Sequence, residues 1–419
     1  MVIRMFRGRA SQQQQIKSQA QPAPAVVSSA ATESAPTMPK VKSIESQTAI
    51  PSNPFAGGAP AAITINLPQD LGKVTDLVAQ FTMTFSTTDT DGCDIAVVPS
   101  PFFVDYYQIL VDGADQERID ASELFAESAS WVSDQWFDLN RSAWNISSTG
   151  GYAPAFNLAD ETATSTKVWY LPLNSNFLMR MKPYISGFAN RFAIKLTLRN
   201  DITVTVKKTG TNTATTCAVS LDDLRLYATE EWLGDASEAH QRAAHQRTAL
   251  YRTIKRNKFT SGLYTSVSNT ADLKVQLSTL KGDAAGLLVY LGPQSPTISQ
   301  LLTHYELSTI GLRDSKNSEI TEQLPAKVVE RQASRILPIS SVMINSSPSN
   351  NYILAFGRNL QEPLETGKFV GGLSFGGAES VIVKPLASLS NVVLTAVAYD
   401  YVNVACVGGR FVLRNGATQ

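Results

Sequence analysis

A Gly-rich stretch near the C-terminus carries the pattern of a serine nucleophile. Gly372-Leu373-Ser374-Phe375-Gly376 matches G-x-S-x-G, which in hydrolases holds the serine on a tight strand-to-helix turn. Such a serine needs an acid and a histidine base later in the chain, yet no histidine follows His304. We therefore interpret Ser374 as structural. Its neighbouring glycines are expected to supply the strained backbone of a turn or bulge between strands.

A group of acidic residues resembles a calcium-binding loop. Asp89, Asp91 and Asp94 alternate around Gly92, and carboxylates are ligands that Ca²⁺ prefers. The glutamate that closes an EF-hand loop is missing, because Ser100 occupies the required offset. An Asp-Gly pair is also a common hairpin turn. The three aspartates are thus a candidate calcium site, with a hydrated hairpin tip as the favoured interpretation. No other metal ligand, no catalytic residue and no cofactor is predicted.

The histidines and cysteines form no metal or redox motif. His240 and His245 are five residues apart in a predicted helix, so they do not share a face as an i, i+4 zinc pair would. Solvated helix side chains are expected instead. Cys93, Cys217 and Cys406 are odd in number and widely spaced, and no C-x-x-C pair exists. We expect reduced thiols in a protein made in a cytoplasm.

Two patterns keep other functions open. Trp131, Trp136 and Trp144 cluster in one segment, and aromatic rings can form the platform of a sugar site. They support an alternative function as a β-sandwich receptor- or carbohydrate-binding protein, unless the rings simply pack a long loop. The scattered carboxylates could also hide the acid pair of a glycoside hydrolase, whose separation is spatial.

Charge and hydropathy narrow the class of protein. The 419 residues are 43% hydrophobic and 17% charged, with a formal net charge of zero. A protein that binds nucleic acid over its surface is normally basic, so sequence-specific nucleic-acid binding is not expected. No apolar run reaches the ~18 residues of a membrane span. No apolar segment follows Arg4, Arg7 and Arg9, so no secretory signal is expected.

Most of the chain beyond Ile63 alternates apolar and polar side chains, as β-strands do. The clearest alternating runs are 63–67, 81–86, 192–199, 202–207 and 273–277, while 392–407 is a nearly continuous strand-like run. Turn pairs such as Asp112-Gly113 and Gly408-Gly409 separate or end them. Strands do not alternate with helices. The pattern predicts an all-β sandwich architecture.

Composition divides the chain into four parts. Residues 1–58 are rich in Gln, Ala, Ser and Pro, and the first 50 carry six Lys or Arg and two Glu, so we expect a flexible, basic arm. Residues 59–228 and 256–419 form β-rich blocks. A helical connector, 229–255, is predicted because Glu230 to Lys255 lacks Pro and has one Gly. A shorter helix is predicted from Ala121 to Ala129.

The order of several segments carries a family resemblance. These are Tyr106 to Gly113, Trp169 to Leu173, Phe192 to Leu198, Leu273 to Gly282, Gly286 to Val289, Gly371 to Phe375 and Val392 to Cys406. In this order they resemble the double jelly-roll major capsid proteins of tailless icosahedral, often membrane-containing, bacteriophages, the adenovirus-hexon-like lineage. The resemblance spans about 60–419.

The resemblance implies a fold and a role. The fold would be two tandem eight-stranded jelly-roll β-sandwiches. The role would be structural rather than enzymatic: pseudo-hexagonal homotrimers that tile the icosahedral shell of a virion. The implied partners are neighbouring copies of the chain, minor capsid and vertex proteins, and an inner membrane surface reached by the basic arm.

Overall fold

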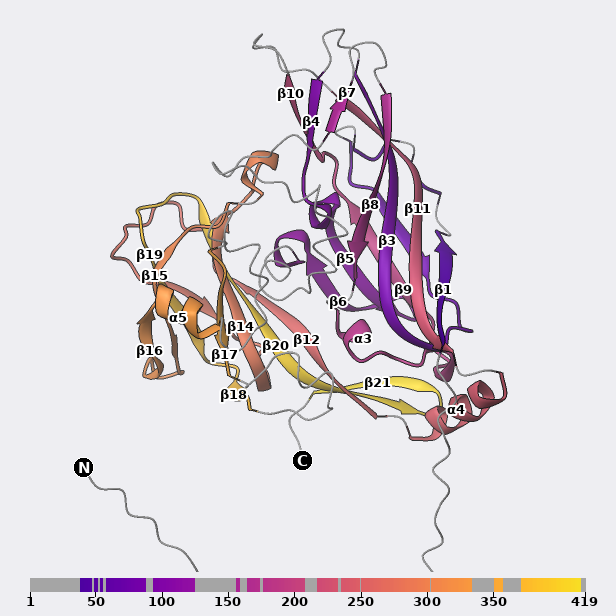
Figure 1. The fold of residues 1–419 in the computed structure, drawn as a ribbon. Helices are drawn as coiled ribbons and strands as arrows, with labels where there is room; N and C mark the ends of the chain where they lie inside the picture. The colour runs from indigo at the N-terminus through magenta and orange to yellow at the C-terminus, as the bar shows by residue number, and fades with distance from the viewer. Residues whose placement is uncertain are drawn as a thin grey trace, which may run out of the picture. The chain divides into compact units, whose positions relative to one another are not determined.

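Strands dominate the part of the chain that the computed structural model describes (Figure 1). The described residues are 38–46, 49–51, 53–55, 58–87, 93–124, 156–158, 164–173, 176–207, 217–232, 235–248, 250–301, 303–333, 350–356 and 371–415. Residues 38–419 belong to one compact unit. No helix in the described ranges is long and apolar enough to cross a bilayer.

In the first half, eight of the described strands form two four-stranded sheets. They are β1 (Met38–Glu45), β2 (Ala62–Asn66), β3 (Lys73–Thr87), β5 (Val104–Val111), β6 (Ala114–Asp120), β8 (Thr164–Pro172), β9 (Phe192–Leu198) and β11 (Cys217–Trp232). The sheet orders are β1-β11-β3-β8 and β2-β9-β5-β6. Counted along the chain, the eight strands therefore lie in the orders 1-8-3-6 and 2-7-4-5. This antiparallel double-sheet arrangement is a jelly roll.

The second half repeats the same arrangement. Its eight strands are β12 (Leu250–Thr260), β13 (Leu273–Gln276), β14 (Lys281–Pro293), β15 (Leu307–Arg313), β16 (Glu319–Pro325), β17 (Tyr352–Ala355), β19 (Ser380–Pro385) and β20 (Val392–Val407). The sheet orders are β12-β20-β14-β17 and β13-β19-β15-β16, again 1-8-3-6 and 2-7-4-5. The prediction of two tandem eight-stranded jelly rolls is confirmed. The shared topology also reveals a duplication that the amino-acid sequence does not display.

Both rolls carry additional strands and helices. A three-stranded sheet joins β4 (Cys93–Val97), β7 (Phe156–Leu158) and β10 (Thr203–Lys207) in the order β10-β4-β7. β18 (Leu373–Gly376) pairs with β14, and β21 (Arg410–Asn415) pairs with β20. Among the described residues, the helices are α3 (Phe177–Arg180), α4 (Asp235–Thr248), α5 (Ala326–Ala333) and a helical turn at 121–124, with 3₁₀ turns η1 (Ser100–Phe103), η2 (Ile185–Gly187) and η3 (Ile298–Gln300).

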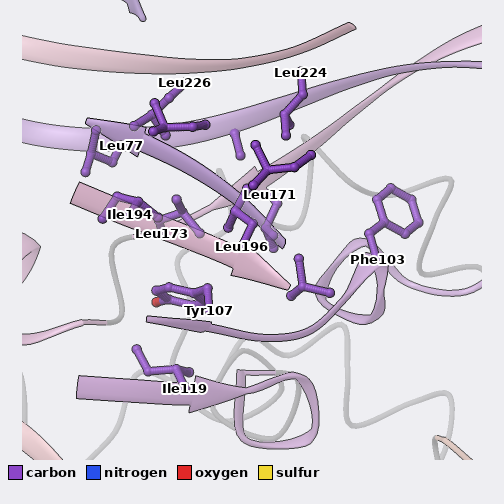
Figure 2. Packing of buried hydrophobic residues seen from close by; sticks show 14 of the residues in the cluster. Leu77, Phe103, Tyr107, Ile119, Leu171, Leu173, Ile194, Leu196, Leu224 and Leu226 are labelled. Atoms are coloured by element: carbon purple, nitrogen blue, oxygen red, sulfur yellow. The ribbon is translucent and has the colours of Figure 1, made fainter. Parts of the chain in front are cut away.

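Alternating side chains build the core of each roll. Along β3 every second residue from Leu77 to Phe85 is fully buried, while the residues between them stay partly exposed. One face of each sheet thus points into its sandwich and the other away from it. Figure 2 shows side chains of one sheet facing those of the other, namely Leu77, Leu171, Leu224 and Leu226 opposite Tyr107, Ile119, Ile194 and Leu196. A separate buried cluster fills the second roll.

Two predicted turns have the backbone that their sequences require. Asp112 and Gly113 join β5 to β6 with φ of 51° and 80°, and Gly408 and Gly409 join β20 to β21 with φ of 58° and 81°. Two consecutive positive φ values match the right-handed twist of a hairpin. The Asp112 carboxylate also accepts hydrogen bonds from the Asn190 amide and from the Arg191 N–H at 2.8 Å.

The arm predicted for residues 1–58 was too long, because part of this range belongs to the first roll. β1 lies within residues 1–58, yet it pairs with β11 along all eight of its residues and forms the first strand of the first roll. Phe55 is buried as well. β1 is an edge strand with one buried apolar side chain, Ile44, so its own sequence gives little strand signal. Pairing with β11 supplies what local propensity lacks.

The predicted connector helix was too long at both ends. Only α4 is helical, because β11 continues to Trp232 and β12 begins at Leu250. β12 has four Lys or Arg and neither Pro nor Gly, so from sequence it extended the helical pattern. It pairs with β20 over eleven residues, which places the start of the second roll at Leu250. Of the shorter predicted helix, residues 121–124 are helical and the remainder falls outside the described ranges.

Candidate functional site

Ser374 lies on a short strand that pairs with a distant strand of the second roll. It is exposed on β18, opposite Asp283 of β14, and its hydroxyl donates to the Asp283 carboxylate. In the turn that follows, the N–H groups of Gly376, Gly377 and Ala378 point to the Glu379 carboxylate, with the shortest contact of each at 3.0 Å. Partial burial opposes ionisation, but these N–H groups hold the pKa of Glu379 below its usual value. The amides that could serve an anionic substrate thus bind a carboxylate of the chain itself.

The other predicted site residues are only partly described. Asp94 lies in β4, opposite Val206 of β10, while Asp89 and Asp91 fall outside the described residues. Within the described ranges, no three His, Cys, Asp or Glu side chains are grouped as a metal site would need. Cys217 and Cys406 are free thiols. Trp131, Trp136 and Trp144 lie outside the described ranges, so the sugar-platform hypothesis stays a prediction.

The two helix histidines have different surroundings. His240 is exposed on α4, as expected. His245 is not solvated as predicted, because it packs edge-on against Phe188 at 4.8 Å between ring centres, and its Nδ1 lies 3.0 Å from the Tyr251 hydroxyl. Burial lowers the pKa of His245 to about 4. The reason is that α4 packs on η2 and β20, so one side of the helix is covered.

The most distinctive polar structure is the junction where the second roll meets the first. Its centre is Glu117 of β6, a carboxylate only 4% exposed. One oxygen accepts the N–H of Phe177 in the first roll at 2.9 Å, and the other accepts the N–H of Arg256 in the second roll at 2.8 Å. Hydrogen bonds to a buried carboxylate are among the stronger ones in proteins. Glu117 therefore ties α3 to β12 across the two rolls.

A lysine of β12 makes a second link. Lys258 contacts the carboxylate of Asp120 and lies 2.7 Å from that of Glu123, both in the first roll. Burial alone would lower the pKa of Lys258, but Glu123, Tyr290 and Asp120 raise it above its usual value. Burial likewise raises the pKa of Glu123 against the attraction of Lys258. The ammonium group is thus held in its charged form between two carboxyl groups of the other roll.

Further contacts between the two rolls accompany those of Glu117 and Lys258. The Thr253 hydroxyl donates to the Phe177 carbonyl at 2.9 Å. The hydroxyl groups of Ser122 and Tyr290 are 3.3 Å apart. The Arg180 guanidinium lies over the Tyr399 ring, 5.8 Å from its centre, in cation–π geometry. Each contact joins a residue of the first roll to one of the second.

An apolar layer lies beneath the polar contacts. The outward face of the β12-β20-β14-β17 sheet carries a buried cluster made of Ile254, Ala285, Leu288, Tyr290, Ile353, Val397, Tyr399 and Tyr401. A sheet face that points away from its own sandwich is buried only when another layer covers it. The first roll supplies that layer in this chain, so the junction combines apolar burial with buried polar links.

A cleft of about 300 Å³ opens beside the junction. Both rolls line it, with Asp105, Arg118, Asp120 and Arg199 on one side and Lys258, Tyr290, Gln300 and His304 on the other. Its charges pair internally: Arg118 with Asp120 at 2.8 Å and Arg199 with Asp105 at 3.2 Å. His304 stacks on Tyr290, and burial lowers its pKa to about 4. This arrangement suits an adhesive contact between rolls better than acid–base chemistry.

Sequence reasoning did not find the junction. Its partners are far apart in the chain; Glu117 and Arg256, for example, are separated by 139 residues. One signal was present: in β6, Glu117 occupies the same face as the buried Ile119, where alternation calls for an apolar residue. An acid at such a position indicates a buried polar link.

Comparison with known proteins gives no match to a protein-family model and none to a curated protein sequence. Solved structures do match. A chain of the PBCV-1 virus capsid aligns with a TM-score of 0.65 at 13% identity, covering 91% of this chain and 97% of its own. The Faustovirus major capsid protein aligns with a TM-score of 0.56 at 11% identity, over 92% and 93% of the two chains.

The mavirus major capsid protein aligns with a TM-score of 0.53 at 10% identity and covers 98% of both chains. The resemblance drawn from the sequence was to bacteriophage proteins, whereas these three structures have other viral sources. At such low identity the agreement concerns the fold, and it extends over nearly the whole of each chain. The chain has the double jelly-roll fold of these viral major capsid proteins.

Proposed function

We propose that the chain is the major capsid protein of an icosahedral virus. Three copies form a homotrimer in which six jelly rolls give a pseudo-hexagonal outline, and the trimers tile the shell of the virion. The observation that carries the proposal is the repeated topology, 1-8-3-6 and 2-7-4-5 in each half, in a chain that aligns almost end to end with capsid proteins.

The junction gives this proposal a mechanical basis. A shell subunit with two rolls presents a fixed outline only if the rolls do not rotate against each other. The hydrogen bonds of Glu117, the ion pairs of Lys258 and the buried face around Tyr399 all resist such rotation. Polar links fix the register of an interface, while apolar burial supplies most of its free energy.

The proposed role is structural and requires neither a catalytic centre nor a cofactor. Neighbouring trimers, minor capsid proteins and vertex proteins are the partners that such a shell needs. The basic segment before β1 has four Lys or Arg and one Glu in residues 1–37, which suits a negatively charged surface on the inside of the shell, such as a membrane.

The alternative, a receptor- or carbohydrate-binding virion protein, depended on Trp131, Trp136 and Trp144. These residues lie outside the described ranges, whereas the solved structures reported above are capsid proteins. The capsid proposal is therefore preferred.

Light scattering on size-fractionated protein tests the proposal. At micromolar concentration the full-length protein should have a mass of three times the 45.3-kDa chain. A protein that is monomeric throughout this range contradicts the proposed trimer.

A further inference from the structure

The two rolls differ in how one equivalent sheet face is covered. In the second roll, the outward face of β12-β20-β14-β17 is buried, with Leu288, Val397 and Tyr399 all at 0% exposure. In the first roll, the equivalent sheet is β1-β11-β3-β8. Apart from the buried Pro172 at the end of β8, its outward positions stay partly or largely exposed in the described structure, and Val41 and Val168 are 61% and 45% exposed.

The composition of this exposed face suits an interface. The outward residues of β3 from Val78 to Ser86 are uncharged, and the outward Asp223 and Arg225 of the neighbouring β11 neutralise each other in an ion pair of 2.6 Å. Strand pairing places Ser43, Tyr227 and Val78 side by side across β1, β11 and β3. Interface cores are depleted of charged residues and enriched in aromatic ones.

The first roll contacts the second roll through the helical turn that follows its fifth strand, where β6 ends at Asp120 and Ala121–Leu124 follow. The second roll has an equivalent helix at the same place. In the second roll, β16 ends at Pro325 and α5 follows directly. The burial patterns agree: Ala121 and Leu124 are 5% and 2% exposed. Their counterparts Ala326 and Val329 are both 1% exposed.

One position differs in burial between the turn 121–124 and α5. Glu123 is 1% exposed because it meets Lys258 of the second roll, whereas its counterpart Val328 is 41% exposed. Within one chain, the helical turn 121–124 of the first roll packs on the second roll, while the outward face of the β1-β11-β3-β8 sheet stays exposed. In the second roll, the outward face of the β12-β20-β14-β17 sheet is covered, while α5 keeps Val328 exposed. The exposed α5 and the exposed sheet face are the two surfaces that a further contact of the same kind would join.

We propose that α5 of one copy, with Val328 at its centre, packs on the outward face of β1, β11 and β3 of a second copy. The contact repeats between chains the junction that joins the two rolls within a chain. It is heterologous, so it closes into a ring when the rotation permits, and three copies give a ring of six rolls. This inference rests on the proposed trimer and specifies which surfaces form it.

A photo-cross-linker tests the contact directly. Val328→benzoylphenylalanine is prepared with heavy-isotope labelling, mixed with unlabelled protein, reassembled, irradiated and digested for mass spectrometry. The inference predicts mixed-isotope cross-links to peptides of residues 38–45, 73–87 or 217–232. The same replacement at Leu263, which is also 41% exposed, should give no cross-links to these strands.

The outcomes separate the two proposals. A trimer whose Val328 cross-links fall on other strands overturns this interface and leaves the capsid proposal standing. A wild-type protein that stays monomeric overturns both. As a second measurement, Val328→Glu should lower the trimer fraction at least tenfold at micromolar concentration, whereas Leu263→Glu should leave it unchanged. Equal trimer fractions for the two variants would also overturn the interface.

Discussion

At the scale of single residues, Glu117 shows how a buried charge can organise a two-roll chain. Glu117→Ala leaves the N–H groups of Phe177 and Arg256 without their acceptor. A loss on the order of 2–4 kcal/mol in the free energy of unfolding is expected. Urea denaturation measures it. Asp115→Asn, at an exposed position of the same strand, is the matched control and should change stability little. Equal effects of both variants would show that Glu117 does not link the rolls.

The Gly-rich segment around β18 provides a second residue test. A side chain at Gly372 would place its Cβ 3.1 Å from the Tyr401 ring and 3.3 Å from the Ala284 carbonyl. Crowding is therefore the constraint there, and the strained φ expected from the sequence belongs to Gly371 and Gly377, at 85° and 86°. Gly372→Val should cost about 1–3 kcal/mol in thermal or urea unfolding. Ser374→Ala should be nearly neutral. Stoichiometric labelling of Ser374 by a fluorophosphonate would instead establish a nucleophile.

Asp400 gives a pH dependence whose sign is fixed. Burial raises the pKa of this carboxyl to about 7 from the usual 3.8. The folded state thus holds the proton more tightly, so the stabilisation is complete below the unfolded pKa and is lost as the pH rises through about 7. His245 and His304, with pKa values lowered to about 4, act in the opposite sense below the usual 6.5.

Comparing two proteins isolates the Asp400 contribution. Asp400→Asn keeps the histidines, so the difference in Tm between variant and wild type should increase in favour of the variant from pH 4 to pH 8. Parallel Tm curves over this range would exclude a titrating Asp400.

At the scale of elements, β1 divides the N-terminal region into two functional parts. Deleting residues 1–37 should leave folding and the trimer intact while it impairs shell assembly, because the basic segment is removed and the first roll is not. Deleting residues 1–46 also removes β1, which unpairs one edge of β11 and uncovers the site of Ile44. The Tm should fall sharply only for the protein with the longer deletion. Equal stability of the two truncated proteins would mean that β1 is dispensable.

The elements also show where sequence reasoning was sufficient. Strands with strong alternation, such as β9, and hairpins with Asp-Gly or Gly-Gly turns were predicted from local pattern because their signal is local. β1 and β12 were missed, since their strand character depends on pairing with β11 and β20. The junction was out of reach for the same reason: Glu117 and Lys258 acquire partners only when distant segments meet.

At the scale of the whole molecule, the chain contains the same jelly-roll topology twice, but different surfaces of the two rolls are buried. The first roll covers the second within the chain, and the complementary free surfaces face outward. Under the interface proposed above, both exposed surfaces are covered only in a closed assembly of copies. The low charged fraction, 17%, fits a protein with much of its surface in contact with copies of itself.

Electron microscopy of the purified full-length protein tests this account most directly. Class averages viewed along the symmetry axis should show a threefold particle with six lobes, one for each jelly roll. Isolated two-lobed particles, or a ring with a number of lobes other than six, would contradict the proposal that this chain forms the trimeric building block of a viral shell.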